Sequence, residues 1–132
     1  MTERYLLDTN VWVGLAKGED GLTTKLQSLG PSRVVSCSVV VAELMFGARK
    51  SQRVEANLIG FTRLLSPFES LPFDNDAASH YGVIRADLER AGTPIGSNDL
   101  LIAAIARSRD LLLVTRNVRE FVRVGGLRVE QW

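Results

Sequence analysis

Short, almost wholly apolar runs alternate along this chain with segments whose apolar residues recur at helical spacing. The strongest runs are residues 4–8, 34–36 and 111–115, and a last short one covers 127–130. Strands without polar alternation are covered on both faces, as in parallel sheets whose crossover connections are helices. The pattern therefore predicts an α/β domain with a mostly parallel central sheet covered by helices on both faces.

Helical segments fill the intervals between these runs. The pattern predicts helices over 9–15, 21–29, 38–50, 52–65, 74–91 and 97–108, a helical turn at 117–122 and an extended piece at 71–73. Ser38 and Ser97 are expected to act as helix N-caps, and Gly92 as a C-terminal stop. With 132 residues and no repeat or linker-like stretch, the chain is predicted to be a single domain over 1–132.

Three acidic residues interrupt or border apolar segments. Asp8 ends the first predicted strand, Glu43 lies within the apolar run 39–46, and Asp99 opens the run 99–106. A carboxylate in a buried-looking segment is usually paired or bound to a metal ion. Because sites in such folds form beyond the carboxyl ends of the strands, the three acids are expected to converge on one edge of the sheet. Carboxylates and water suit Mg²⁺ or Mn²⁺, so a divalent-cation site is predicted.

The same acids belong to motifs that follow one another along the chain. These are Leu7-Asp8-Thr9-Asn10, Ala42-Glu43-Leu44 with Gly47-Ala48 after it, and the segments 94–104, 114–121 and 126–132. Together they resemble the PIN-domain ribonucleases, in particular the VapC toxins of bacterial toxin–antitoxin pairs, over essentially the whole chain. The resemblance implies a PIN-like fold and a Mg²⁺- or Mn²⁺-dependent endoribonuclease that acts on structured RNA such as transfer RNA.

The resemblance also implies roles for individual residues. Asp8, Glu43 and Asp99 correspond to the metal-binding acids of the family, and Asn117 stands where many members have a fourth acid. Asn117 can still offer its amide oxygen to a metal ion, although it adds no charge. Asp8, Glu43, Asp99 and Asn117 are therefore the candidate catalytic residues. Glu120, one helical turn further, is the alternative source of a fourth carboxylate.

Supporting roles are expected for residues near the last long strand. Thr115 is predicted to orient a bound water, and Arg116, Arg119 and Arg85 are candidates for contacts with RNA phosphates. Lysine occurs only at positions 17, 25 and 50, so arginine supplies most of the positive charge, although a GC-rich genome would explain that bias equally well. The net charge of +1 gives no further sign of a nucleic-acid partner.

Partners and location follow from the same resemblance. It implies a VapB-type antitoxin and a homodimer, with an apolar groove drawn from Trp12, Leu15, Met45, Phe46, Leu58 and Phe61, which are otherwise core residues. No apolar run approaches the roughly 20 residues that span a bilayer. Asp8 interrupts the only early apolar stretch, so the chain is expected in the cytoplasm without a membrane partner.

Other interpretations of these residues remain open at this point. Asp8 could simply cap a helix, Glu43 could lie on the polar side of an amphipathic helix, and Asp99 could complement a helix dipole. A receiver-type signalling module also has an acidic α/β site, but it needs a late lysine, and none follows Lys50. The other class is a catalytically weak or silent PIN-like module that binds RNA or protein.

Overall fold

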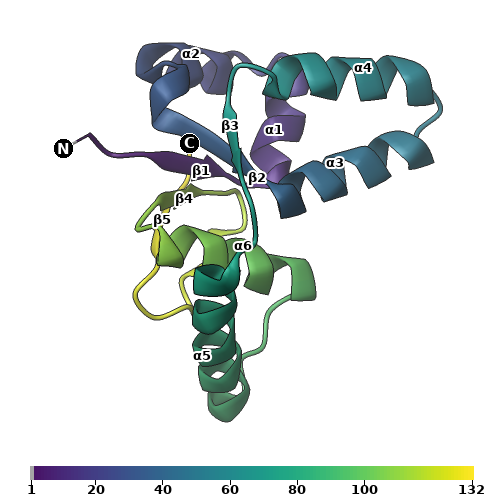
Figure 1. Cartoon of the computed structure of the whole chain (residues 1–132). Coiled ribbons are helices and arrows are strands. Elements are labelled where there is room, and N and C mark those ends of the chain that lie inside the picture. Colours follow the sequence, from purple (N-terminus) through teal and green to yellow (C-terminus); the bar gives the residue numbers. More distant parts are fainter. Residues whose placement is uncertain (1) are drawn as a thin grey trace.

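The computed structural model describes residues 2–132 and shows a five-stranded sheet between two groups of helices (Figure 1). The strands follow the order β3-β2-β1-β4-β5, and every neighbouring pair is parallel. Their bounds are β1 Tyr5–Leu7, β2 Val34–Cys37, β3 Glu69–Leu71, β4 Leu112–Val114 and β5 Arg128–Glu130. The predicted α/β class, with a mostly parallel and doubly covered sheet, is confirmed.

Helices α1 to α4 lie on one side of the sheet in Figure 1, and α5 and α6 lie on the other. The α3 and α4 helices form a hairpin that projects from the body of the molecule. The bounds are α1 Thr9–Ala16, α2 Asp20–Leu29, α3 Ser38–Lys50, α4 Val54–Leu65, α5 Asn75–Ala91, α6 Ser97–Ser108 and α7 Val118–Phe121, with a 3₁₀ turn η1 at Pro31–Arg33. Within the described chain, no helix is long and apolar enough to cross a bilayer.

Two predicted helix starts were wrong. Ser38 and Ser97 are the first helical residues of α3 and α6, and the capping positions are Cys37 and Gly96. Neither start has a side-chain cap among the described residues. The backbone is extended at Cys37, so the buried strand β2 passes directly into its helix without a polar capping residue. By contrast, Asp74 and Gly92 bound α5 as predicted, with Gly92 in the left-handed region.

The short strand before α5 also differs from the prediction. An extended piece was expected at 71–73, but β3 spans Glu69–Leu71 and pairs with β2. Pro72 explains the difference, because proline has no N–H to continue the ladder. The strand therefore ends where the proline begins.

The register of β1 and β4 determines what lies at the carboxyl edge of the sheet. Leu7 is paired with Val114, and the backbone N–H of Asp8 donates to the Val114 carbonyl at 2.8 Å. The next residues, Asp8 and Thr115, therefore leave their strands side by side. Trp12 fixes the first turn of α1, because its fully buried indole donates to the Leu7 carbonyl at 3.0 Å.

Candidate active site

Asp8 is held in place at the end of β1 by two hydrogen bonds. Its side chain is only 4% exposed. One carboxylate oxygen accepts from the Thr115 hydroxyl at 2.7 Å, and the other accepts from the Thr9 N–H at 2.8 Å. Asp8 is thus the capping residue of α1, as one interpretation of the sequence had it, and it also faces the carboxyl edge of the sheet. Burial raises the pKa of Asp8, and these hydrogen bonds oppose that shift.

Thr115 connects Asp8 to the loop after β4. This fully buried side chain donates its one hydroxyl proton to Asp8, while its oxygen accepts from the Asn117 N–H at 2.9 Å. The hydroxyl therefore orients the Asp8 carboxylate in this structure. The predicted contact between Thr115 and a bound water stays a prediction.

Glu43 reaches the same region from the second turn of α3. Its Oε1 accepts from the Thr9 hydroxyl at 2.6 Å, and its Oε2 accepts a longer bond of 3.4 Å from the Asn98 amide. The two donors come from the starts of α1 and α6 respectively. Glu43 is therefore a half-buried residue directed to the sheet edge, and it is not a freely solvated part of a helix surface.

Asp99 lies in the first turn of α6 and is half-buried. Burial is the main cause that raises its pKa to about 7, with further contributions from Asp8, Glu120 and Glu43. A carboxyl group whose pKa is raised by burial and by neighbouring acids is typical of a site that binds a cation, although ion-pair networks in proteins also shift pKa values.

These side chains share one surface pocket of about 390 Å³, here called the acidic pocket. It is lined by Asp8, Thr9, Asn10, Val13, Glu43, Asp99, Arg116 and Asn117. The structure thus brings together all four predicted catalytic residues and one predicted phosphate-binding arginine. Sequence reasoning missed the contributions of Thr9, Asn10 and Asn98, although Thr9 and Asn10 directly follow Asp8 in the motif.

Asn117 and Glu120 form a unit beside this pocket. The Asn117 amide donates to a Glu120 carboxylate oxygen at 2.9 Å, and the Glu120 carboxylate is close enough to Asp99 to raise its pKa. Asn117 therefore orients Glu120, the half-buried carboxylate considered above as the alternative source of a fourth acid.

Replacing Asn117 by aspartate is expected to destabilise the metal-free fold and to tighten Mn²⁺ binding. The new carboxylate would lose the hydrogen bond to Glu120 and add a charge next to the acids of the pocket. Melting temperature in EDTA and Mn²⁺ titration calorimetry would measure the two effects. Unchanged Mn²⁺ affinity would show that the Asn117 side chain does not face the cation.

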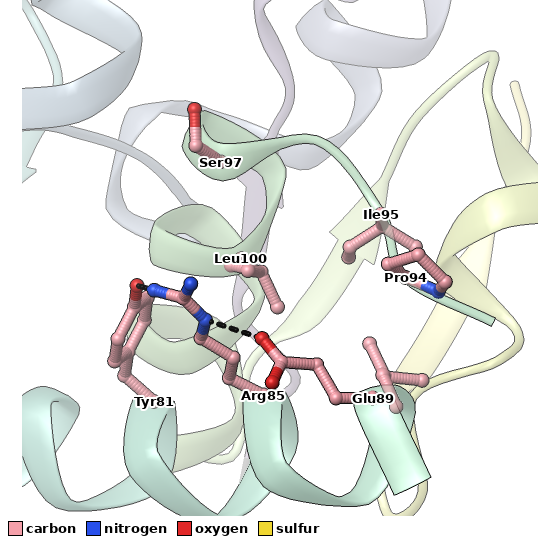
Figure 2. A pocket seen from close by; sticks show the side chains of 8 residues that line it. Tyr81, Arg85, Glu89, Pro94, Ile95, Ser97 and Leu100 are labelled. Carbon is pink, nitrogen blue, oxygen red and sulfur yellow. Dashed lines mark hydrogen bonds and ion pairs between the residues drawn. The ribbon is translucent and has the colours of Figure 1, made fainter. Parts of the chain in front are cut away.

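Two of the predicted phosphate-binding arginines lie elsewhere. Arg85 lies on α5 in a separate pocket, where its Nε donates to Glu89 at 2.8 Å and its Nη1 donates to the Tyr81 hydroxyl at 2.9 Å (Figure 2). Arg119 is exposed on α7 and, within residues 2–132, is outside the lining of the acidic pocket. Only Arg116 of the three reaches the pocket.

The oxygen-rich lining fits a hydrated divalent cation better than a closed metal cage. Among the described residues, no three histidine, cysteine, aspartate or glutamate side chains form a compact ligand group. Mg²⁺ is usually held by one or two carboxylates and keeps several waters, so it does not require such a group. Burial, together with the nearby carboxylates of Asp8 and Glu43, raises the pKa of Asp99, as expected of a pocket that favours added positive charge.

Comparison with known proteins agrees with this geometry. The model of the PIN domain family matches residues 5–127. The chain is 43% identical to the tRNA(fMet)-specific endonuclease VapC of Shigella flexneri, over 98% of both proteins. It superimposes on the DNA-bound VapBC structure from Salmonella typhimurium with a TM-score of 0.93 and 40% identity, covering 99% of both chains. For VapBC2 from Rickettsia felis bound to promoter DNA, the TM-score is 0.92 and the identity 37%, covering 97% of this chain and 98% of that one.

A parallel sheet with acids at its carboxyl edge, together with the match to the family model, defines the class as a PIN-domain nuclease. The chain belongs to the VapC family of endoribonuclease toxins from toxin–antitoxin systems. The family predicted from the sequence motifs is thereby confirmed.

Proposed function

We propose that this protein is a metal-dependent toxin that cleaves transfer RNA in the acidic pocket, with Asp8, Glu43 and Asp99 as its catalytic acids and Asn117 as the fourth residue of the site. The observation that carries the proposal is the meeting of three carboxylates from β1, α3 and α6 in one surface pocket. The name of the Shigella flexneri relative, a tRNA(fMet)-specific endonuclease, supports transfer RNA as the substrate class.

Asp8, Glu43 and Asp99 would hold Mg²⁺ or Mn²⁺. When bound, the cation would lower the pKa of a water and neutralise charge on phosphate oxygens. Thr115 fixes the direction of Asp8, and Thr9 fixes that of Glu43, through hydrogen bonds of 2.7 Å and 2.6 Å. These bonds keep the carboxylates oriented before substrate arrives, which reduces the reorganisation needed for reaction.

Glu120 and Asp99 would share the remaining acid–base role. Burial and the neighbouring carboxylates, Glu120 among them, raise the pKa of Asp99 to about 7, so Asp99 is partly protonated near neutral pH when the cation is absent. Asn117 donates its amide to Glu120 and so fixes the second carboxylate of the pair. We assign Glu120 the place of the fourth acid and Asn117 the role of orienting it.

The partners proposed for this chain are a VapB-type antitoxin and a second copy of itself. The support is that the relatives from Salmonella typhimurium and Rickettsia felis are VapBC complexes. An apolar pocket between α1, α3 and α4 borders the acidic pocket and includes Val13, Leu44 and Phe61. Phe46 on α3 is a large apolar side chain that is 64% exposed, and it lies outside the lining of this pocket within the described residues. Trp12, by contrast, is core and contributes nothing to a groove.

We further propose that residues 1–132 form one domain that acts in the cytoplasm. The support for one domain is that the core is continuous from β1 to the last strands, with Leu6, Leu113 and Phe121 in one buried cluster. A cytoplasmic location would give the enzyme access to transfer RNA.

Metal-dependent cleavage is the direct test of the proposal. The purified full chain is expected to convert total transfer RNA into discrete fragments with Mg²⁺ or Mn²⁺, and to leave it intact with EDTA. Calorimetric titration with Mn²⁺ on the same preparation would show whether the cation binds. Cation binding without cleavage of any transfer RNA would favour the alternative of a silent RNA- or protein-binding module.

A further inference from the structure

Arg116 stands where two surface pockets meet. It lines the acidic pocket together with Asp8, and it also lines a neighbouring pocket that includes Lys25 and Trp132. An RNA strand that leaves the acidic pocket in this direction would pass Arg116 before it reached Lys25. On that path, Arg116 would lie within reach of a phosphate next to the cleaved one.

Both the backbone and the side chain of Arg116 are anchored to the region of α1. Its backbone N–H donates to the Asn10 side-chain oxygen at 3.2 Å, and its Nη2 forms an ion pair with the Glu19 carboxylate. Glu19 precedes α2 at the capping position, yet its side chain does not cap that helix within the described chain. Its carboxylate is directed to Arg116 instead.

Gly14 provides the space for this ion pair. A Cβ at Gly14 would lie 2.7 Å from Arg116 Nη2, 3.0 Å from Glu19 Oε2 and 2.6 Å from Leu22 Cδ1. The pair thus packs against α1 at a buried position without a side chain. The Arg116 and Glu19 side chains remain 40% and 41% exposed, but the close approach to the α1 backbone restricts their movement.

We propose that Glu19 is a positioning residue that fixes Arg116 to bind an RNA phosphate beside the acidic pocket. A guanidinium has five N–H donors in a planar fork, so Nη2 can serve Glu19 while other donors bind a phosphate. An arginine that is already fixed loses less side-chain entropy when RNA binds. The proposal rests on the proposed function, and it adds the residue that precedes α2 to RNA binding.

The competing explanation is that Glu19 only cancels the charge of Arg116. The two explanations predict opposite changes in RNA affinity when Glu19 is replaced by alanine. If Glu19 only cancels charge, then Glu19→Ala removes a repulsion and tightens RNA binding. If Glu19 positions Arg116, the same change weakens binding by about three- to tenfold because the side chain must be ordered anew. Glu19→Gln, which keeps a hydrogen-bond acceptor, should fall between the wild type and Glu19→Ala.

Binding should be measured in the Asp99→Asn background by fluorescence anisotropy of labelled total transfer RNA at several salt concentrations. Arg116→Ala should weaken binding and reduce the slope of log affinity against log salt by about 0.7–0.9, as for one lost phosphate contact. In the Arg116→Ala background, Glu19→Ala should bring no further weakening. The matched control is the exposed Asp87–Arg90 pair on α5, whose alanine variants should bind like the parent.

Each outcome separates the two proposals. If the parent protein binds transfer RNA and Glu19→Ala leaves that affinity unchanged or raises it, the positioning role is overturned. The proposal that transfer RNA is the substrate would still stand. Absence of transfer RNA binding in every variant, with melting temperatures preserved, would overturn both. In the cleavage-competent chain, the positioning role predicts that Glu19→Ala raises KM and leaves kcat unchanged.

Discussion

Replacing Asp99 by asparagine is expected to abolish RNA cleavage and, at the same time, to stabilise the metal-free protein. Loss of a metal-binding carboxylate should lower kcat/KM on the order of a thousandfold, which corresponds to roughly 4 kcal/mol of transition-state stabilisation. The stability gain follows from the raised pKa of Asp99, because the fold disfavours the charged carboxylate that asparagine removes.

The raised pKa of Asp99 also determines how the stability of the metal-free fold changes with pH. Asp99 has a pKa of about 7 in the folded chain against an ordinary value of 3.8, so the folded state binds more protons between these values. Its contribution to stability is complete below about pH 4 and is lost as the pH rises to 7. At pH 8 in EDTA, the asparagine variant should therefore be more stable by about 1–3 kcal/mol, after allowance for solvent screening.

Thermal unfolding in EDTA and in Mg²⁺ would measure the change in stability, and RNA cleavage would measure the change in activity. The advantage of Asp99→Asn should shrink in Mg²⁺, because the cation stabilises only the chain that binds it. Asp87→Asn is the matched control, since Asp87 is an exposed acid on α5. A variant that cuts at the wild-type rate would exclude Asp99 as a ligand. A variant that is less stable in EDTA would contradict the account of repulsion and burial.

Thr115→Val should lower both stability and activity, for a different reason. Valine has nearly the shape of threonine but leaves the buried Asp8 oxygen and the Asn117 N–H without the hydroxyl they now share. The loss of a hydrogen bond to a buried carboxylate is expected to cost about 2–3 kcal/mol of unfolding free energy. Weaker orientation of Asp8 should lower activity by roughly 10–100-fold.

Thr115→Ser separates the hydroxyl from the methyl group. Serine keeps the donor to Asp8 and removes one buried methyl, so it should cost about 1 kcal/mol of stability while activity stays close to that of the wild type. Urea unfolding and RNA cleavage on the three proteins would test this. Equal activity of the valine and serine variants would mean that the hydrogen bond to Asp8 has no catalytic importance.

The alternation of strands with helices and the position of the acids were predictable because both leave direct marks in the sequence. Strands covered on two faces must be apolar throughout, so the single acid at the end of residues 4–8 stood out. The capping positions Cys37 and Gly96 were not predicted, because neither residue forms a side-chain capping hydrogen bond that the sequence could reveal. Pro72 could have placed the end of β3, since proline has no N–H for a ladder.

Contacts between distant segments were beyond the sequence alone. The pairing of Thr115 with Asp8 depends on the register of β1 against β4, and that of Glu19 with Arg116 depends on the space above Gly14. Arg85 shows an error that could have been avoided. Glu89 lies four residues after it on the same helix, a spacing that favours an ion pair within the helix.

The parallel pairing of β1 with β4 also has a consequence for protein synthesis. Asp8 and the hydroxyl that orients it are separated by 107 residues, and Arg116, Asn117 and Glu120 follow that hydroxyl. A growing chain on the ribosome therefore carries the first two acids long before it can assemble a nuclease. Translation that stops before β4 would release a fragment in which β1 keeps β2 as a neighbour but lacks β4 and the pocket residues after it, so toxicity requires synthesis through β4 and the loop that follows.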